Sequence, residues 1–187
     1  WRDCTMSDRM EDRINPEAYD RVTSRFVSEY GYIGPCSEET ITKYYGGKEW
    51  MPGDRIWNLH NNTFEKATVP EGIRRHYIDP ETLKIRDYLQ YARLVQGLMY
   101  GYSLEAIRFY PRNDGAIFWM YNDTWGEVGW TIIDYYLDRK PSFYFVKRAF
   151  APFKLILRVS EDQKFVRSMG INDTASDVIT DLRFGYA

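Results

Sequence analysis

Apolar residues recur at helical spacing over one long stretch of the chain. The positions are Ile85, Tyr88, Leu89, Ala92, Val95, Met99, Tyr102 and Ala106. This period predicts a long helix, which follows the start signal Asp79-Pro80-Glu81 and is closed by Pro111. Gly97 and Gly101 lie within it, and they favour either close packing against another element or a bend.

Three shorter helices are predicted from capping signals. Asn15, followed by proline, favours a helix over residues 16–24. Ser37 can cap a second helix over 38–45, which a Gly-Gly pair ends, and a third helix over 142–150 lies between two prolines. From Gly46 to Ile78 no period holds, so this segment, with its tryptophans, is expected to be a long functional loop.

The remaining apolar runs predict strands. RFVSEY favours a buried strand over residues 25–29, and the continuous run GAIFWMY, 115–121, suits a strand buried on both faces. Beyond Pro152 the segments FKLILRVS, KFVRSMGI and DVITDLRFGY, separated by turn residues, predict short antiparallel strands.

The order of these elements indicates two parts. Helices and strands alternate up to Pro152, which is typical of an α/β fold with a parallel sheet or barrel, and only strands follow, as at the start of a β-sandwich. The predicted domains are therefore 1–152 and 153–187.

Composition and charge narrow the function. The chain has 187 residues, and 25 Lys and Arg against 27 Asp and Glu leave a net charge of −2, which argues against nucleic-acid binding. No apolar run of about 18 residues predicts a membrane span. The N-terminal residues lack the apolar core of a signal peptide, which favours the cytoplasm and leaves secretion open. Cys4 and Cys36 are far apart in sequence and only two histidines are present, so neither a metal nor another cofactor is expected.

Polar groups follow the two strands predicted in the α/β part. Glu29 ends the first strand, and Asn122, Asp123 and Trp125 follow the second. Ligands collect at the carboxyl ends of parallel strands, so these groups are expected to face one cleft. A carboxylate among aromatic rings, which make up 17% of the chain, suits nucleophilic or proton-transfer chemistry such as glycoside hydrolysis. The alternative is that Glu29 only pairs with a buried arginine such as Arg25.

Two motifs resemble a known enzyme family. FVSEYGYIGP, followed about ninety residues later by GAIFWMYNDTWGEVGWTIIDYYLDRKPSFYFVKRAFAP, resembles the C-terminal half of the catalytic barrel in glycoside hydrolase family 2, closest to its β-mannosidase branch. The first motif is short, whereas the second is long and specific. The tail FVRSMGINDTASDVITDL resembles the opening of the β-sandwich that follows the barrel.

The resemblance implies strands seven and eight of a TIM (β/α)₈ barrel and a retaining mechanism with a carbohydrate substrate. Glu29 matches the nucleophile of the family, and Trp119 and Asn122 match positions beside the innermost sugar. Asp123 and Trp125 are expected to be neighbours of that sugar.

Several further residues could either contact the substrate or have a purely structural role. Scaffolding is favoured over ligand contact at three positions of the second motif: Trp130, Asp134 and Lys140. The long segment that contains Trp50, Trp57 and His60 is expected to form the rim of the pocket, and His60 to be a surface residue.

One catalytic group is missing from the sequence. A retaining glycosidase needs a second carboxyl group to protonate the leaving oxygen, and the family carries it in an Asn-Glu pair at the end of strand four. No Asn-Glu pair occurs here, and only 28 residues precede Glu29. The chain is therefore expected to be inactive alone, with the remainder of the barrel on the same or another chain as its partner. Two alternatives stay open: a β-galactosidase, β-glucuronidase or exo-β-glucosaminidase specificity, and a non-catalytic sugar-binding or structural fragment.

Overall fold

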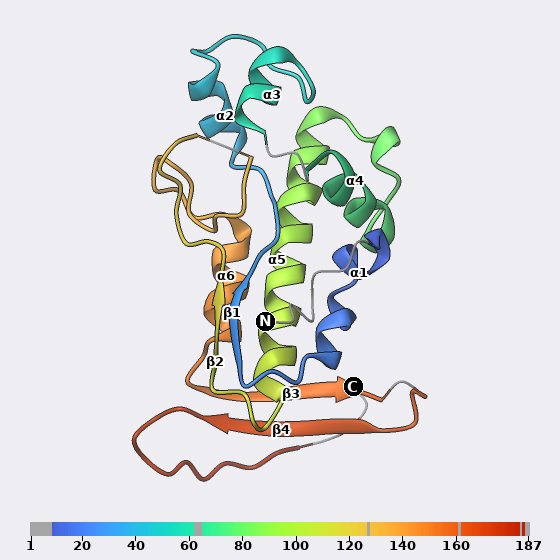
Figure 1. Ribbon diagram of the computed structural model, residues 1–187, viewed down its shortest axis with the longest axis vertical. Coiled ribbons are helices and arrows are strands. Elements are labelled where there is room, and N and C mark those ends of the chain that lie inside the picture. Colours follow the sequence, from blue (N-terminus) through green and yellow to red (C-terminus); the bar gives the residue numbers. More distant parts are fainter. Residues whose placement is uncertain (1–8, 62–64, 127, 161, 184, 186–187) are drawn as a thin grey trace. The chain divides into compact units, whose positions relative to one another are not determined.

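The computed structural model of the protein describes residues 9–61, 65–126, 128–160, 162–183 and 185. They form two compact units, Trp1–Ala149 and Phe150–Ala187. The first unit mixes helices with a parallel strand pair, and the second is a strand hairpin (Figure 1). The elements are α1 (Met10–Ile14), η1 (Pro16–Arg21), β1 (Phe26–Tyr30), α2 (Glu38–Tyr44), α3 (Arg55–His60), α4 (Glu65–His76), η2 (Pro80–Thr82), α5 (Ile85–Phe109), β2 (Gly115–Phe118), α6 (Pro141–Ala149), β3 (Phe153–Val159) and β4 (Val166–Asn172).

The long predicted helix is confirmed as α5, which runs through the centre of the first unit (Figure 1). Its N-terminal half packs with α2, α3 and α4 in one apolar core, and its C-terminal half packs with η1, β1 and α6 in a second. The buried residues of α5 lie between Leu89 and Ile107, and they include Leu89, Ala92, Val95, Met99 and Ala106 from the apolar spacing that predicted this helix. In the part of the chain that the structure describes, no helix is long and apolar enough to cross a bilayer.

The glycines of α5 serve close packing against α6. A Cβ atom on Gly97 would lie 2.6 Å from the ring of Phe145, and one on Gly101 would lie 3.0 Å from it. The absence of side chains at these positions lets the aromatic ring of α6 lie against the backbone of α5. Of the two roles expected for these glycines, the structure shows close packing.

β1 and β2 form a parallel pair on which the site depends. Phe26 pairs with Gly115, and Tyr30 pairs with Phe118. Both strands run toward the end of the unit where α2 and α3 lie (Figure 1). The expectation that residues 115–121 form a strand buried on both faces is wrong, because β2 ends at Phe118 and the side chain of Ile117 is 56% exposed.

The expectation of a long irregular loop over residues 46–78 is also wrong, because α3 and α4 lie within it. Asp54 caps α3 by accepting a hydrogen bond from the backbone nitrogen of Trp57 at 2.8 Å. Trp57, Val69 and Ile73 are buried in the first core. Pro70 lies inside α4, and this residue obscured the helical pattern in the sequence.

The shorter helices were predicted with mixed success. α2 is confirmed, and Ser37 caps it by accepting a hydrogen bond from the backbone nitrogen of Thr40. α6 is confirmed as well. The helix expected over 16–24 is a 3₁₀ helix that ends at Arg21, and α1 before it was not predicted.

The second unit is an antiparallel hairpin of β3 and β4, with all seven residues of each strand in register. Ile156 is buried, whereas one face of β3 exposes four apolar side chains to solvent. They are Phe153, Leu155, Leu157 and Val159. The third strand expected over residues 177–186 is wrong for the described residues 177–183 and 185, which form no strand.

Candidate active site

The carboxyl ends of β1 and β2 bring Glu29 and Trp119 to one edge of the strand pair. Glu29 is the penultimate residue of β1, and its side chain is exposed. Trp119 directly follows β2, and its backbone nitrogen donates a 2.6 Å hydrogen bond to the carbonyl oxygen of Tyr30. The indole of Trp119 is 47% exposed. A solvent-accessible carboxylate and a solvent-accessible indole therefore stand on adjacent segments.

The alternative role of Glu29 as the ion-pair partner of Arg25 is wrong. Arg25 Nη2 lies 2.9 Å from Asp114 Oδ2, and both side chains are largely exposed. This pair joins the amino ends of the two strands, because Arg25 precedes β1 and Asp114 precedes β2. It leaves the carboxylate of Glu29 at the opposite end.

The structure explains why the short motif that contains Glu29 has a glycine at position 31. A Cβ atom at this position would lie 2.2 Å from the carbonyl oxygen of Trp119 and 2.9 Å from Cδ1 of Trp130. Real Cβ contacts do not come this close, so a larger residue would push the end of β1 away from the segment after β2. The glycine thus permits the approach that places Glu29 beside Trp119.

A group of buried tyrosines packs beneath the carboxyl ends of β1 and β2. The hydroxyl of Tyr100, on α5, lies within hydrogen-bond distance of the carbonyl oxygens of Trp119 and Trp130. The rings of Tyr30 and Tyr32 pack against the ring of Tyr100, and Tyr19 packs against both of them. Burial raises the pKa of Tyr30, Tyr32 and Tyr100. These phenols therefore stay neutral near pH 7 and act as structural groups.

The segment after β2 carries the other predicted site residues. The peptide bond between Trp119 and Met120 is cis. Asn122 is exposed, and its backbone forms a bridge with Ile133. Trp125 is also exposed, whereas Asp123 is only 5% exposed and its backbone nitrogen donates a hydrogen bond to Ile133. The structure thus presents Asn122 and Trp125 at the surface and places Asp123 beneath it.

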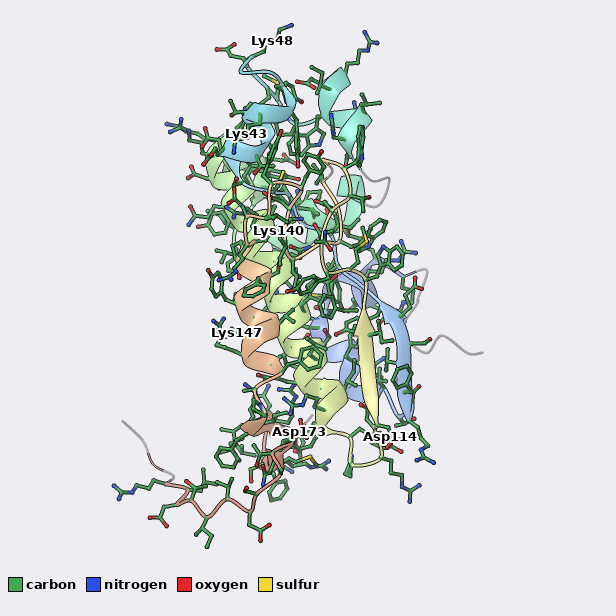
Figure 2. All side chains as sticks on the ribbon, turned by 90° about the vertical axis from the view of Figure 1, so that its left-hand side faces the viewer. Lys43, Lys48, Asp114, Lys140, Lys147 and Asp173 are labelled. Atoms are coloured by element: carbon green, nitrogen blue, oxygen red, sulfur yellow. The ribbon has the colours of Figure 1, made fainter. Side chains whose placement is uncertain are left out.

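Buried charged groups hold this segment in place. Lys140, labelled in Figure 2, is 1% exposed and donates hydrogen bonds to the carbonyl oxygens of Gly34 at 2.8 Å and Gly129 at 3.4 Å. Asp134 accepts a 2.6 Å hydrogen bond from Thr40 Oγ1 and two more from backbone nitrogens. Burial lowers the pKa of Lys140, while the charges of Asp123 and Asp134 oppose that shift. Lys140 and Asp134 are scaffold residues, as favoured from the sequence.

The segment that was expected to form the rim of the pocket contains both core residues and partly exposed residues. Trp57 is 2% exposed and stacks on Trp50, so it belongs to the core. His60 is half-buried and stacks on Trp125 and Tyr44. The participation of Tyr44 was not predicted, because this residue lies 16 positions before His60 and only the fold brings the two rings together.

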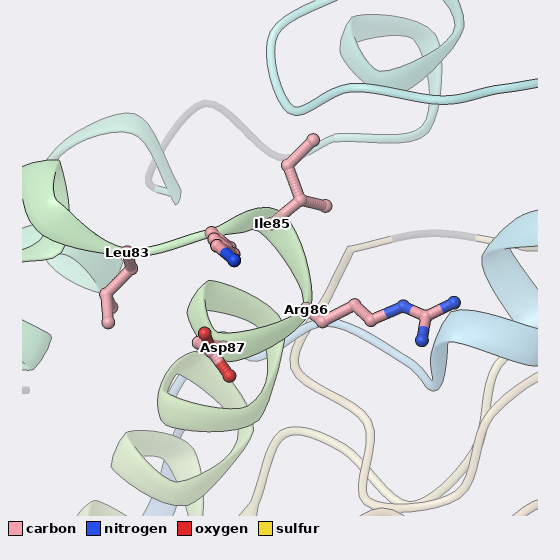
Figure 3. Close-up of a pocket in the computed structure, with 5 residues that line it drawn as sticks. Leu83, Ile85, Arg86 and Asp87 are labelled. Carbon is pink, nitrogen blue, oxygen red and sulfur yellow. The ribbon is translucent and has the colours of Figure 1, made fainter.

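The pocket shown in Figure 3 is separate from the candidate site, and none of the predicted site residues lines it. It is lined by Leu83, Lys84, Ile85, Arg86 and Asp87 at the N-terminal end of α5. Arg86 points out of it to pair with Glu38 at 3.0 Å. In the described residues, no group of three or more His, Cys, Asp and Glu side chains is arranged to hold a metal ion.

Comparison with known proteins identifies relatives over about three quarters of the chain. No family model matches the chain. β-Mannosidase B of Thermothelomyces thermophilus is 30% identical over 151 residues, which cover 73% of this chain and 17% of that protein. β-Mannosidase B of Emericella nidulans is 25% identical over 146 residues, which cover 76% of this chain and 17% of the relative.

A solved structure agrees with these relatives. The β-D-mannosidase of Dictyoglomus thermophilum matches with a TM-score of 0.75 and 32% identity, over 86% of this chain and 20% of that one. The chain thus spans about one sixth to one fifth of the length of the proteins it resembles. These similarities place the chain in the β-mannosidase-like family of glycoside hydrolase family 2.

Proposed function

We propose that this chain is a segment of a retaining exo-β-glycosidase that acts on β-mannosides, with Glu29 as its nucleophile. The observation that carries the proposal is the placement of an exposed glutamate and an exposed tryptophan at the carboxyl ends of two paired parallel strands. Ligands of α/β folds bind at this edge. The relatives that are named β-mannosidases support the choice of sugar.

The proposed reaction has two displacement steps at the anomeric carbon. The carboxylate of Glu29 attacks that carbon, the bond to the leaving oxygen breaks, and a second carboxylic acid gives its proton to that oxygen. Water then attacks the glycosyl ester on Glu29, activated by the same second group in its carboxylate form. The exposure of Glu29 suits this role, because the carboxylate must reach a substrate that arrives from solvent.

Neighbouring residues hold the sugar in this proposal. Trp119 stacks on the ring of the innermost sugar, and the exposed amide of Asn122 binds sugar hydroxyls. Asp123 lies beneath the surface of this segment and is proposed as a neighbour of the innermost sugar. Trp125 contacts the substrate further along the same segment.

The proposal extends to the architecture of the whole protein. β1 and β2 are strands seven and eight of a TIM barrel, and the second unit opens a β-sandwich. Phe26 and Ile117, on these strands, are each more than half exposed, as expected for strands that other strands cover in a complete barrel. The rest of the barrel supplies the acid/base residue, since no Asn-Glu pair occurs in this sequence. The 187 residues alone are therefore expected to hydrolyse nothing.

Two other functions fit parts of the same observations. Another family 2 specificity, for β-galactosides, β-glucuronides or β-glucosaminides, keeps Glu29 in its role and changes the sugar. A panel of chromogenic glycosides given to the full-length protein distinguishes these. A non-catalytic sugar-binding protein would keep the tryptophans without using Glu29 as a nucleophile, and it would form no covalent intermediate.

The test is a covalent trap in the full-length protein. A 2-deoxy-2-fluoro-β-mannosyl fluoride should add one glycosyl group to the peptide that contains Glu29, as seen by mass spectrometry. Glu29→Gln should lower kcat by about 10⁴-fold or more and abolish labelling while the fold is retained. Glu17→Gln, a change at an exposed acid on η1, serves as the control and should leave both unchanged. Near-normal turnover by Glu29→Gln would refute the assignment.

A further inference from the structure

Four aromatic rings form a continuous stack beside the candidate site. The ring of Trp125 stacks on His60 with centroids 4.5 Å apart and an interplanar angle of 16°. His60 stacks on Tyr44 at 5.1 Å and 7°. Tyr44 stacks on Tyr136 at 5.9 Å and 25°. These distances and angles are those of attractive offset stacking.

The stack is fixed to the protein at several points. Nδ1 of His60 is hydrogen-bonded to the carbonyl oxygen of Gly126, and the carbonyl oxygen of His60 accepts a 2.7 Å hydrogen bond from Val128. A carbonyl oxygen only accepts, so Nδ1 carries the proton. A Cβ atom on Gly126 would lie 2.3 Å from the ring of Tyr44, so glycine is needed for the segment to pass this ring.

The two ends of the stack differ. At one end the ammonium group of Lys43 lies 4.6 Å from the centroid of Tyr136 and covers that ring. At the other end Trp125 is 48% exposed, although His60 covers one face of its indole. Tyr136 is also 43% exposed, but the ammonium group of Lys43 lies over its ring, whereas in the described residues no cation is seen over the free face of Trp125. The indole of Trp125 is therefore the ring of the stack best placed to receive a ligand.

We infer that Trp125 is the platform of a second sugar-binding subsite, which takes the pyranose on the leaving-group side of the scissile bond. This inference rests on the proposed function. The apolar face of a pyranose can stack on an exposed indole, as other flat apolar groups do. An indole that is already fixed by His60 loses little conformational entropy when it binds, which favours affinity.

The innermost sugar and the second sugar would contact different tryptophans because these are held by different elements. Trp119 is tied to Tyr30, next to Glu29, through its backbone nitrogen. Trp125 lies further along the segment and is fixed to α3 through His60. Asn122 is exposed between them in the sequence and can bind hydroxyls of either ring. The arrangement thus favours a substrate of at least two sugars.

Isothermal titration calorimetry on the full-length protein tests the inference. In the Glu29→Gln background, which prevents turnover, we expect β-1,4-linked mannobiose to bind on the order of tenfold more tightly than mannose. Adding Trp125→Ala should remove most of this tenfold advantage and leave the affinity for mannose unchanged. Trp125→Phe should retain part of it. Tyr144→Ala, at an aromatic residue of similar exposure (46%) on α6, is the matched control and should change neither affinity.

Three outcomes would overturn the inference in distinguishable ways. If Trp125→Ala leaves the advantage of the disaccharide intact, Trp125 binds no second sugar. If it weakens mannose and mannobiose equally, Trp125 belongs to the innermost subsite. If the protein with Trp125 intact binds neither sugar, the proposed function itself fails.

Discussion

At the scale of residues, side chains near the carboxyl ends of β1 and β2 differ mainly in how far they are exposed to solvent. Glu29 is exposed and Trp119 is half exposed, whereas Asp123, Asp134 and Lys140, on the segment between β2 and α6, are buried. The sequence motif pointed to Glu29 and Trp119 but did not show that Asp123 lies beneath the surface. Burial depends on what the rest of the chain places over a side chain, and a single motif does not contain that information.

Burial also changes the pKa of the Cys36 thiol, and this change can be measured through the reactivity of the thiol. Burial raises the pKa of this thiol to about 12, although Lys140 nearby opposes the shift. An unperturbed thiol is about half ionised at pH 8.5. A thiol with a pKa of about 12 is ionised to about one part in three thousand at that pH.

We therefore expect Cys36 in the native protein to react with iodoacetamide about three orders of magnitude more slowly at pH 8.5 than in urea, since the thiolate is the reactive form. Because the pKa is raised, the native rate should keep rising with pH well above 9, whereas the rate in urea should level off. Peptide mass spectrometry measures both rates. A native rate within tenfold of the unfolded rate would contradict the shift.

At the scale of elements, one side chain of α5 joins three segments of the first unit. Nε2 of Gln96 donates hydrogen bonds to the carbonyl oxygens of Tyr32 at 2.9 Å and Thr131 at 3.1 Å. Its Oε1 accepts a 2.9 Å hydrogen bond from Ser142, at the start of α6. The glutamine is fully buried. It thereby holds the segments that follow β1 and β2 against the same helix.

Gln96→Leu should lower the free energy of unfolding by about 1–3 kcal/mol, because leucine leaves buried carbonyl groups without their donor. Gln90→Leu, at an exposed position on the same helix, should change it by less than about 0.5 kcal/mol. Urea denaturation of both variants measures the difference. Equal effects of the two substitutions would show that the buried hydrogen bonds contribute nothing specific.

Elements were predictable from the sequence where a periodic pattern and burial coincide. α5 and α6 followed from apolar spacing and flanking signals. α4 was missed because Pro70 interrupts the helical signal, although Val69 and Ile73 stand one turn apart on its buried side. The ring stack was missed because its four members come from three separate parts of the chain, and no local pattern relates them.

At the scale of the whole molecule, the hairpin unit exposes more apolar surface than a stable isolated unit would. Phe153, Leu155, Leu157 and Val159 line one face of β3, and each is at least 39% exposed. Such surfaces are normally covered by another sheet or by a partner. In the proposed enzyme the rest of the β-sandwich covers this face.

The 187-residue chain by itself should therefore self-associate and show a mass above 22.3 kDa in light scattering. The double substitution Leu155→Lys and Leu157→Lys should shift the mass toward that of the monomer, because charge on this face opposes contact between copies. Thr23→Lys with Thr180→Lys adds the same charge at exposed positions elsewhere and should not. A monomer of the unsubstituted chain would contradict this expectation.

The parallel pairing of β1 with β2 also sets the order in which the protein can be built. Residues 31–114 separate the two strands, so β1 leaves the ribosome long before its partner exists. Closing such a long loop costs more entropy than forming local helices, which can fold while synthesis continues. α2 to α5 are thus available as a template when residues 115–118 emerge. Glu29 and Trp119 would meet only at that late stage, so the edge that carries the proposed site should be among the later features of the first unit to form during translation.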